Sequence, residues 1–276
     1  MQHQEKPADI IVLAGQSNAE GNGFGEINPD YMPSEEILML RDAFPCTYGA
    51  DGTPTLISTR PTVTVIEIAK ERIIDDKPVG NLALFFAQRY AKESLPEGRH
   101  VLIVQTAVGG TGFAGHLWGV GEILDERMKD MVVAALSQNP GNRIVAFLWH
   151  QGEHDAFENP DLTPEQRCAF YENHFFDMLL DFRTHFSAYD VPVITAGFCD
   201  TWAVNYAEQC DAIYRAYRNI CSRDNHICFL PTHDLHSNDQ DVRNGDTIHF
   251  SKHSLMLLGN RYFNAYLALR SKQHKI

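Results

Sequence analysis

Residues 9–18 read DIIVLAGQSN, an apolar run that ends at Gly15 and is followed directly by Gln16 and Ser17. The four consecutive aliphatic residues 10–13 indicate a strand buried on both faces, as in the parallel sheets of α/β proteins. Ligands collect at the carboxyl ends of such strands, so Ser17 stands where a nucleophile would be useful. Serine also favours the N-cap of a helix. Position alone does not decide between nucleophile and cap.

The rest of the chain alternates between strand-like and helix-like segments. Further apolar runs that resemble buried strands cover residues 101–108, 144–149, 191–198 and 227–230. Helical periodicity covers residues 82–93, 123–136, 164–186, 203–221 and 252–269. Thr163 and Pro164 suit the N-cap and first helical position of the third helix. The alternation predicts a five-stranded, mostly parallel sheet with helices on both faces, because right-handed crossovers place them there.

Residues 20–80 depart from this alternation, because they are rich in Gly, Pro, Asn and Asp. One alternating run, TVTVIEI at residues 62–68, predicts a strand with one exposed face. Irregular segments of this length usually have a function, so we expect this one to form a wall beside Ser17. No repeat or linker interrupts the sequence. We therefore expect a single domain over residues 1–276 with a pocket-forming insertion at about 20–80.

Composition limits the classes of partner. The formal net charge is −13, which disfavours binding to nucleic acid or to an anionic membrane. A hydrophobic content of 44% is sufficient for a large core. No apolar run approaches the roughly 20 residues that span a bilayer, and residues 1–9 lack a signal-like apolar stretch. We expect a cytoplasmic protein.

One polar stretch, HDLHSNDQD at residues 233–241, carries side chains that suit zinc or calcium. These side chains are His233, Asp234, His236, Asp239 and Asp241. Their spacing matches no metal site known to us, and a polar loop beside a site entrance explains them as well. The six cysteines form no CxxC pair and suit reduced thiols. We expect no bound metal.

Three strand ends, at residues 15–18, 109–111 and 151–153, converge on one edge of the predicted sheet. A serine nucleophile needs a base, a group that orients the base, and donors for the developing oxyanion. The backbone amides of Ser17 and Gly110 and the side-chain amide of Gln151 are candidate donors. Among 13 histidines, His249 follows Asp246 by three residues in GDTIHFS. The pair suits a base and its orienting carboxylate, but also an acidic loop before a helix.

Four blocks in this order resemble those of the SGNH hydrolases: GQSNA at 15–19, AVGGT at 107–111, WHQGEHD at 149–155 and DTIHFS at 246–251. More narrowly they resemble the branch of sialate O-acetylesterases and family 6 carbohydrate acetyl esterases. The resemblance implies a three-layer α/β/α sandwich with five parallel strands. It also implies that Ser17 is the nucleophile, His249 the general base and acid, and Asp246 the orienting carboxylate.

For the oxyanion hole, the resemblance implies the Ser17 amide, one amide of the Gly109 and Gly110 pair, and the Gln151 side chain. The wider superfamily has asparagine where Gln151 stands, whereas the branch shares the glutamine. Some sialate esterases of this type rely little on their aspartate, which leaves open how much Asp246 contributes to catalysis. Which glycine donates is also open.

Two further residues are candidates for substrate contact. Trp118 suits stacking on a pyranose ring, although it suits the core equally. Glu153 suits a bond to the sugar or to the loop that holds Gln151. A sialate carboxylate would need a cation, for which Arg41, Arg60 and Arg72 are candidates.

The resulting hypothesis is a serine esterase that needs no cofactor and removes O-acetyl groups from a carbohydrate. O-acetylated sialic acid is the expected substrate, and acetylated xylo-oligosaccharide is the alternative with the same chemistry. A non-catalytic carbohydrate-binding protein is the alternative from another class. A binding protein would have no reason to keep a nucleophile beside a base.

Overall fold

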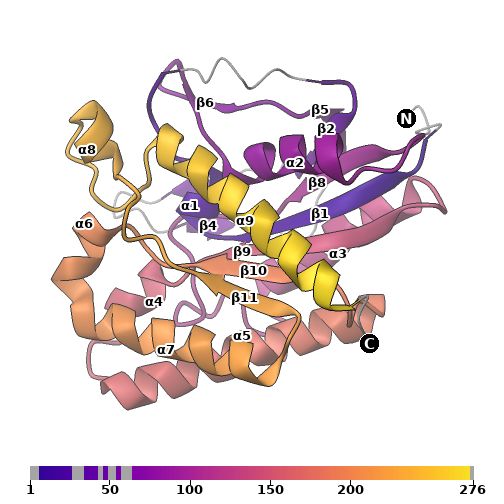
Figure 1. Cartoon of the computed structure of the whole chain (residues 1–276). Coiled ribbons are helices and arrows are strands. Elements are labelled where there is room, and N and C mark those ends of the chain that lie inside the picture. Colours follow the sequence, from indigo (N-terminus) through magenta and orange to yellow (C-terminus); the bar gives the residue numbers. More distant parts are fainter. Residues whose placement is uncertain (1–5, 27–33, 43–45, 49–53, 57–63, 274–276) are drawn as a thin grey trace.

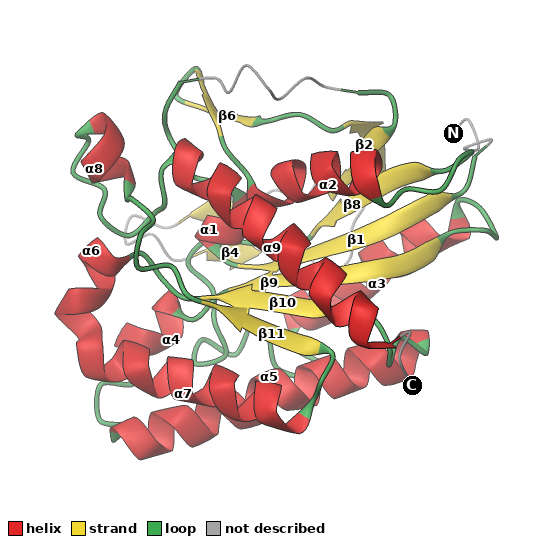
Figure 2. Cartoon of the chain, in the orientation of Figure 1, coloured by secondary structure: helices red, strands yellow, loops and turns green. Residues whose placement is uncertain are grey.

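A seven-stranded sheet lies between two layers of helices (Figure 1 and Figure 2). The structure is a computed structural model that describes residues 6–26, 34–42, 46–48, 54–56 and 64–273. The strand order is β11-β10-β9-β1-β8-β2-β5. The five expected strands are β1 (Ala8–Gly15), β8 (His100–Gln105), β9 (Arg143–His150), β10 (Val193–Ala196) and β11 (Ile227–Leu230). They all pair in parallel, and the three-layer α/β/α architecture is confirmed.

The predicted number of strands, five, was wrong, because residues 20–80 add two strands to the sheet. Strand β2 (Ile37–Asp42) pairs in parallel with β8, and β5 (Thr64–Ile68) pairs antiparallel with β2. Strand β2 has only six residues, and the last two are charged, so its sequence shows no clear alternation of apolar and polar residues. It is a strand because it pairs with β8. The edge strand β5 lies within the alternating run, and its Val65 and Ile68 are 45% and 43% exposed. Residues 62 and 63 lie outside the described residues.

Two short ribbons complete the described strands of this region. Strand β3 (Cys46–Tyr48) pairs with β4 (Pro54–Leu56), and β6 (Arg72–Ile74) pairs with β7 (Lys77–Val79). The region is therefore only partly irregular.

The long helices cover both faces of the sheet. Helices α2 (Leu82–Glu93) and α9 (Lys252–Gln273) lie on one face, and α3 (Ile123–Ser137), α5 (Pro164–Phe186) and α7 (Ala207–Arg223) lie on the other (Figure 2). Side chains along β1 alternate between the two cores, with Ile10 on the α3 side and Ile11 on the α9 side. Thr163 caps α5, as predicted. Within the described part of the chain, no helix is both long and apolar enough to cross a bilayer.

Short helices gather at the carboxyl edge of the sheet, on the left in Figure 1. They are α1 (Ser17–Glu20), α4 (Glu153–Phe157), α6 (Asp200–Ala203), the 3₁₀ turn η1 (Val204–Tyr206) and α8 (Asn238–Val242). The helix expected at 203–221 is therefore divided, because a turn of α6 and η1 precedes α7. Strand β1 lies between β8 and β9, where the strand order reverses, and the site for a ligand is expected at its carboxyl end.

Candidate active site

Ser17 lies in the turn that follows β1. Gly15 makes this turn possible: its φ is +125°, and a Cβ atom there would lie 2.1 Å from the His150 carbonyl oxygen. Gln16 is the N-cap of α1 and Ser17 is its first helical residue, so a capping role for Ser17 is wrong. Ser17 is 7% exposed, and its hydroxyl has no hydrogen-bond partner among the described residues. The hydroxyl is therefore available to a ligand.

Asp246 and His249 form the expected pair. The Asp246 Oδ2 atom lies 2.8 Å from His249 Nδ1, and both side chains are just over one-fifth exposed. The Asp246 carboxylate accepts a hydrogen bond from the N–H at Nδ1. In neutral His249 the Nε2 atom therefore carries the lone pair that can take a proton. Burial alone would raise the pKa of Asp246, but hydrogen bonds from His249 and Asn238 hold it below its usual value. The pair has the chemistry of a base and its orienting carboxylate.

Asn18, the neighbour of Ser17, holds the backbone on both sides of His249. Its Oδ1 atom accepts a hydrogen bond from the Phe250 amide (3.0 Å), and its Nδ2 atom donates to the Ile248 carbonyl (3.2 Å). The same Nδ2 atom donates to Glu153 Oε1 at 2.7 Å. One side chain therefore links the turn that carries Ser17 to the loop that carries His249.

Glu153 and Trp118 lie in the interior, which contradicts the expected contact with substrate. Both are 0% exposed. Glu153 accepts a hydrogen bond from Asn18 and lies 3.7 Å from His150 Nε2. Burial alone would raise the pKa of the Glu153 carboxyl, but His150 and Asn18 together lower it. Trp118 donates from Nε1 to Thr111 Oγ1 and packs edge-on against Trp149. Neither side chain can meet a sugar in this conformation.

Two backbone amides are open at the carboxyl edge. The amides of Ser17 and Gly110 have no partner within the described part of the chain, whereas the Gly109 amide donates to Glu20 Oε2 at 2.9 Å. The geometry favours Gly110 over Gly109 as a donor to an oxyanion. Gly110 also has a φ of +69°, which favours glycine.

Gln151 is less suited to that task than expected. It is 0% exposed, and its amide nitrogen lies 2.6 Å from Asp155 Oδ2 and 3.1 Å from the Thr111 carbonyl. Both amide hydrogens have acceptors, and none is left for an oxyanion. Asp155 in turn accepts from the amides of Phe113 and Ala114. Gln151 therefore shapes the loop after Gly110.

An ion pair connects the insertion to the segment around Ser17. Arg72 pairs with Glu20, whose other oxygen holds Gly109, and also bonds Asn22. Asn22 in turn donates to the Ser17 carbonyl. These bonds occupy Arg72, while Arg41 bonds the Lys70 carbonyl and Arg60 lies outside the described residues.

A second ion pair joins the insertion to the start of α9. Lys252 and Glu71 lie 2.7 Å apart, and their side chains are 2% and 10% exposed. Lys252 is three residues after His249 in the sequence. This buried pair therefore fixes the end of the loop that carries His249.

The polar stretch at 233–241 is divided among separate partners. His233 contacts Asp200 (3.1 Å), Asp234 pairs with Arg261, and His236 contacts Asp241 (2.8 Å). Among the described residues, no three His, Cys, Asp or Glu side chains gather as metal ligands would. The stretch contributes to the loop that carries His249.

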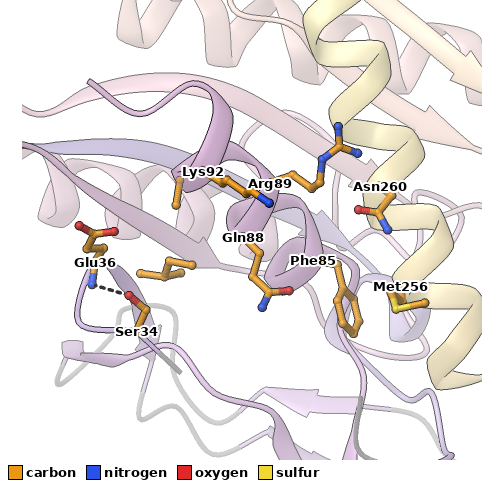
Figure 3. Close-up of a pocket in the computed structure, with 10 residues that line it drawn as sticks. Ser34, Glu36, Phe85, Gln88, Arg89, Lys92, Met256 and Asn260 are labelled. Carbon is orange, nitrogen blue, oxygen red and sulfur yellow. Dashed lines mark hydrogen bonds between the residues drawn. The ribbon is translucent and has the colours of Figure 1, made fainter. Parts of the chain in front are cut away.

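A hollow of about 630 Å³ lies between α2, α9 and the start of β2, away from this edge, and Figure 3 shows side chains that line it. Arg89, Lys92 and Glu36 lie at its margin, and Arg89 also pairs with Glu93. It contains neither Ser17 nor His249.

The chain is similar to one known family and to several solved structures. The family model "Carbohydrate esterase, sialic acid-specific acetylesterase" matches residues 7–268. No curated protein matches the sequence.

Solved structures show the same fold at low sequence identity. NanS superposes with a TM-score of 0.73 at 20% identity, over 97% of this chain and 98% of the other. The Arabidopsis thaliana protein AT4G34215 gives 0.65 at 20% identity, over 95% and 98%. XAC1771, a carbohydrate acetylesterase from Xanthomonas citri, gives 0.56 at 14% identity, over 93% and 55%.

Proposed function

The chain belongs to the carbohydrate esterase family of sialic acid-specific acetylesterases, and we propose that it removes O-acetyl groups from sialic acid, with Ser17 as nucleophile. Membership makes it a carboxylic ester hydrolase that acts on O-acetylated carbohydrates. The observation that carries the proposal is the oriented Asp246–His249 pair at the sheet edge that also carries the unbonded Ser17 hydroxyl.

In the proposed reaction, Ser17 Oγ attacks the carbonyl carbon of the acetyl ester while His249 Nε2 takes the hydroxyl proton. The negative charge that develops on the carbonyl oxygen is stabilised by the Ser17 and Gly110 amides. Collapse breaks the bond to the sugar oxygen, which receives the proton from His249. A water molecule then attacks the acetyl-serine while His249 Nε2 takes its proton. Collapse breaks the bond to Ser17 Oγ, which receives that proton, and acetate leaves.

Asp246 supports both steps without contact to substrate. As an ionised carboxylate it fixes the tautomer of His249 and stabilises the imidazolium formed after each proton transfer. Asn18 is a positioning residue, because it holds the backbone around His249 and touches no reacting atom, and Glu153 positions Asn18. In this proposal the family description favours sialic acid over acetylated xylo-oligosaccharide.

Acetate release from a panel of substrates tests the proposal. The panel contains O-acetylated sialic acid, acetylated xylo-oligosaccharide and p-nitrophenyl acetate. We expect the highest kcat/KM on the sialic acid, and a loss of at least about 10⁴-fold in kcat for Ser17→Ala. Equal rates for wild type and Ser17→Ala would refute the esterase mechanism and favour a binding protein. Faster hydrolysis of the xylo-oligosaccharide than of the sialic acid would refute sialic acid as the preferred substrate.

A further inference from the structure

A row of aromatic side chains crosses the carboxyl edge of the sheet beside β9 and β10, and Phe157 is its exposed member. It runs from α4 to η1 and α6 through His154, Phe157, Tyr206 and Trp202, and we call it the aromatic ridge. Successive ring centroids are 5.1, 6.4 and 4.9 Å apart. Phe157 is 42% exposed, and Val204 beside Tyr206 is 70% exposed.

The ridge is held in place by one buried member, Trp202. Trp202 is only 8% exposed and packs edge-on against Phe198, which follows β10. Burial of Trp202 fixes the base of the ridge, whereas the Phe157 ring is open to solvent. Exposed apolar surface on a fixed base is typical of an interaction site rather than of the core.

Hydrogen bonds connect both ends of the ridge to the segments that carry the nucleophile and the base. The His154 amide donates to Gln16 Oε1 at 3.1 Å, one residue before Ser17. At the other end, Thr201 Oγ1 donates to the Thr247 carbonyl at 2.9 Å, two residues before His249. These bonds attach the ridge to the segments that carry Ser17 and His249.

The chemistry of the ridge suits a sugar ring. Aromatic faces offer a flat apolar surface to the C–H face of a pyranose, and polar groups at the margin bind hydroxyls. Asn205 is exposed between Val204 and Tyr206, and the Glu158 side chain is 45% exposed beside His154. These amide and carboxylate groups can donate to and accept from hydroxyl groups.

We propose that the aromatic ridge binds the sugar ring next to the acetylated residue, so that an O-acetylated oligosaccharide is held by two rings. Gln16 and His154 lie between Ser17 and Phe157 along this path, which leaves the acetylated ring itself nearer the serine. This inference rests on the proposed esterase function of the same site. It adds a second subsite that selects oligosaccharides over free sugars.

Kinetics with three substrates test the subsite: p-nitrophenyl acetate, an O-acetylated monosaccharide, and the same sugar within an oligosaccharide. For Phe157→Ala and Tyr206→Ala we expect kcat/KM to fall about tenfold on the oligosaccharide only. Phe157→Tyr keeps the ring and should keep the wild-type rate. Tyr189→Ala is the matched control, because Tyr189 is 51% exposed and precedes β10 at the opposite edge of the sheet.

An unchanged oligosaccharide rate in the Phe157→Ala/Tyr206→Ala double variant would overturn the subsite, and so would an equal fall on all three substrates. A change in oligomeric state by sedimentation, with unchanged kinetics, would also overturn it and assign the ridge to contact between copies. Failure of the esterase function itself would be distinct, since the wild type would then release no acetate from any substrate.

Discussion

Ser17 and His249 are held in different ways. Ser17 lies in a short turn, residues 15–20, directly after a buried strand, and Gly15 and the β1–β9 pairing fix its backbone. His249 lies in the base loop, residues 231–251, whose only helix in the structure is the short α8. Side chains from elsewhere, chiefly Asn18, hold the backbone around His249.

The difference indicates which changes should affect activity alone. The backbone of the turn depends on Gly15, which packs against β9 in the sheet, so a change at Gly15 endangers the fold. The base loop depends on single hydrogen bonds between side chains and backbone. Loss of one such bond should shift His249 while the sheet stays intact.

The largest effect of this kind is expected for Asn18→Asp. The new carboxylate cannot donate to the Ile248 carbonyl and would lie at hydrogen-bond distance from buried Glu153. Two such carboxylates repel each other, and breaking a buried polar arrangement costs about 3–5 kcal/mol. We expect kcat to fall about a hundredfold to a thousandfold, measured with p-nitrophenyl acetate at neutral pH.

The control is a second change at Glu153. In Asn18→Asp/Glu153→Gln the new amide can donate to the new carboxylate, so we expect part of the activity to return. Glu153→Gln alone keeps an acceptor for Asn18 and should lose little. If both Asn18→Asp variants fold and are equally inactive, Glu153 does not position Asn18.

A smaller effect is expected for Asp246→Asn, and it should depend on pH. The pKa of Asp246 is lower in the folded protein than its usual value of about 3.9, so its ionised form stabilises the fold. This stabilisation is complete above about pH 3.9 and is lost as the pH falls through the lower, folded-state value. Urea unfolding should show a less stable variant at neutral pH and a smaller difference below about pH 4.

Activity is a separate measure for the same variant. We expect kcat to fall about tenfold, because a neutral amide in place of the Asp246 carboxylate would no longer stabilise the imidazolium. Asp239→Asn is the matched control, since Asp239 lies in the base loop and bonds the Gly245 amide rather than His249. An unchanged kcat in Asp246→Asn would show that Ser17 and His249 act without the aspartate.

The smallest effect on kcat is expected for Asn238→Ala, about threefold. Asn238 donates to Asp246 Oδ2 (2.8 Å) and to the Asn22 carbonyl, but Asp246 keeps its bonds to His249. Ser254→Ala removes a comparable buried bond, to the His236 amide, that lies away from Asp246. Equal losses in the two variants would mean that Asn238 acts on stability and does not position Asp246.

The alternation of apolar strands with helices was enough to predict the α/β/α layers, five of the strands and the bounds of α5, and Thr163 was predicted as its N-cap. Strand β2 was missed, because its six residues carry no clear pattern and become a strand through pairing with β8. The same limitation explains Trp118: an aromatic residue near a motif can face a ligand or the core, and only packing against Trp149 places it inside.

At the site, the sequence by itself determined that Ser17 follows a buried strand and that Asp246 precedes His249 by three residues. Both are local facts of spacing along the chain. Only the tertiary structure decided that Asn18 bonds the backbone around His249. It also decided that the Gly109 amide has a hydrogen-bond partner whereas the Gly110 amide has none among the described residues, and that the Gln151 side chain points into the interior. The bonds of Asn18 to Ile248, of Gly109 to Glu20 and of Gln151 to Thr111 join segments far apart in sequence. They depend on how the strands are ordered and packed, which no local pattern encodes.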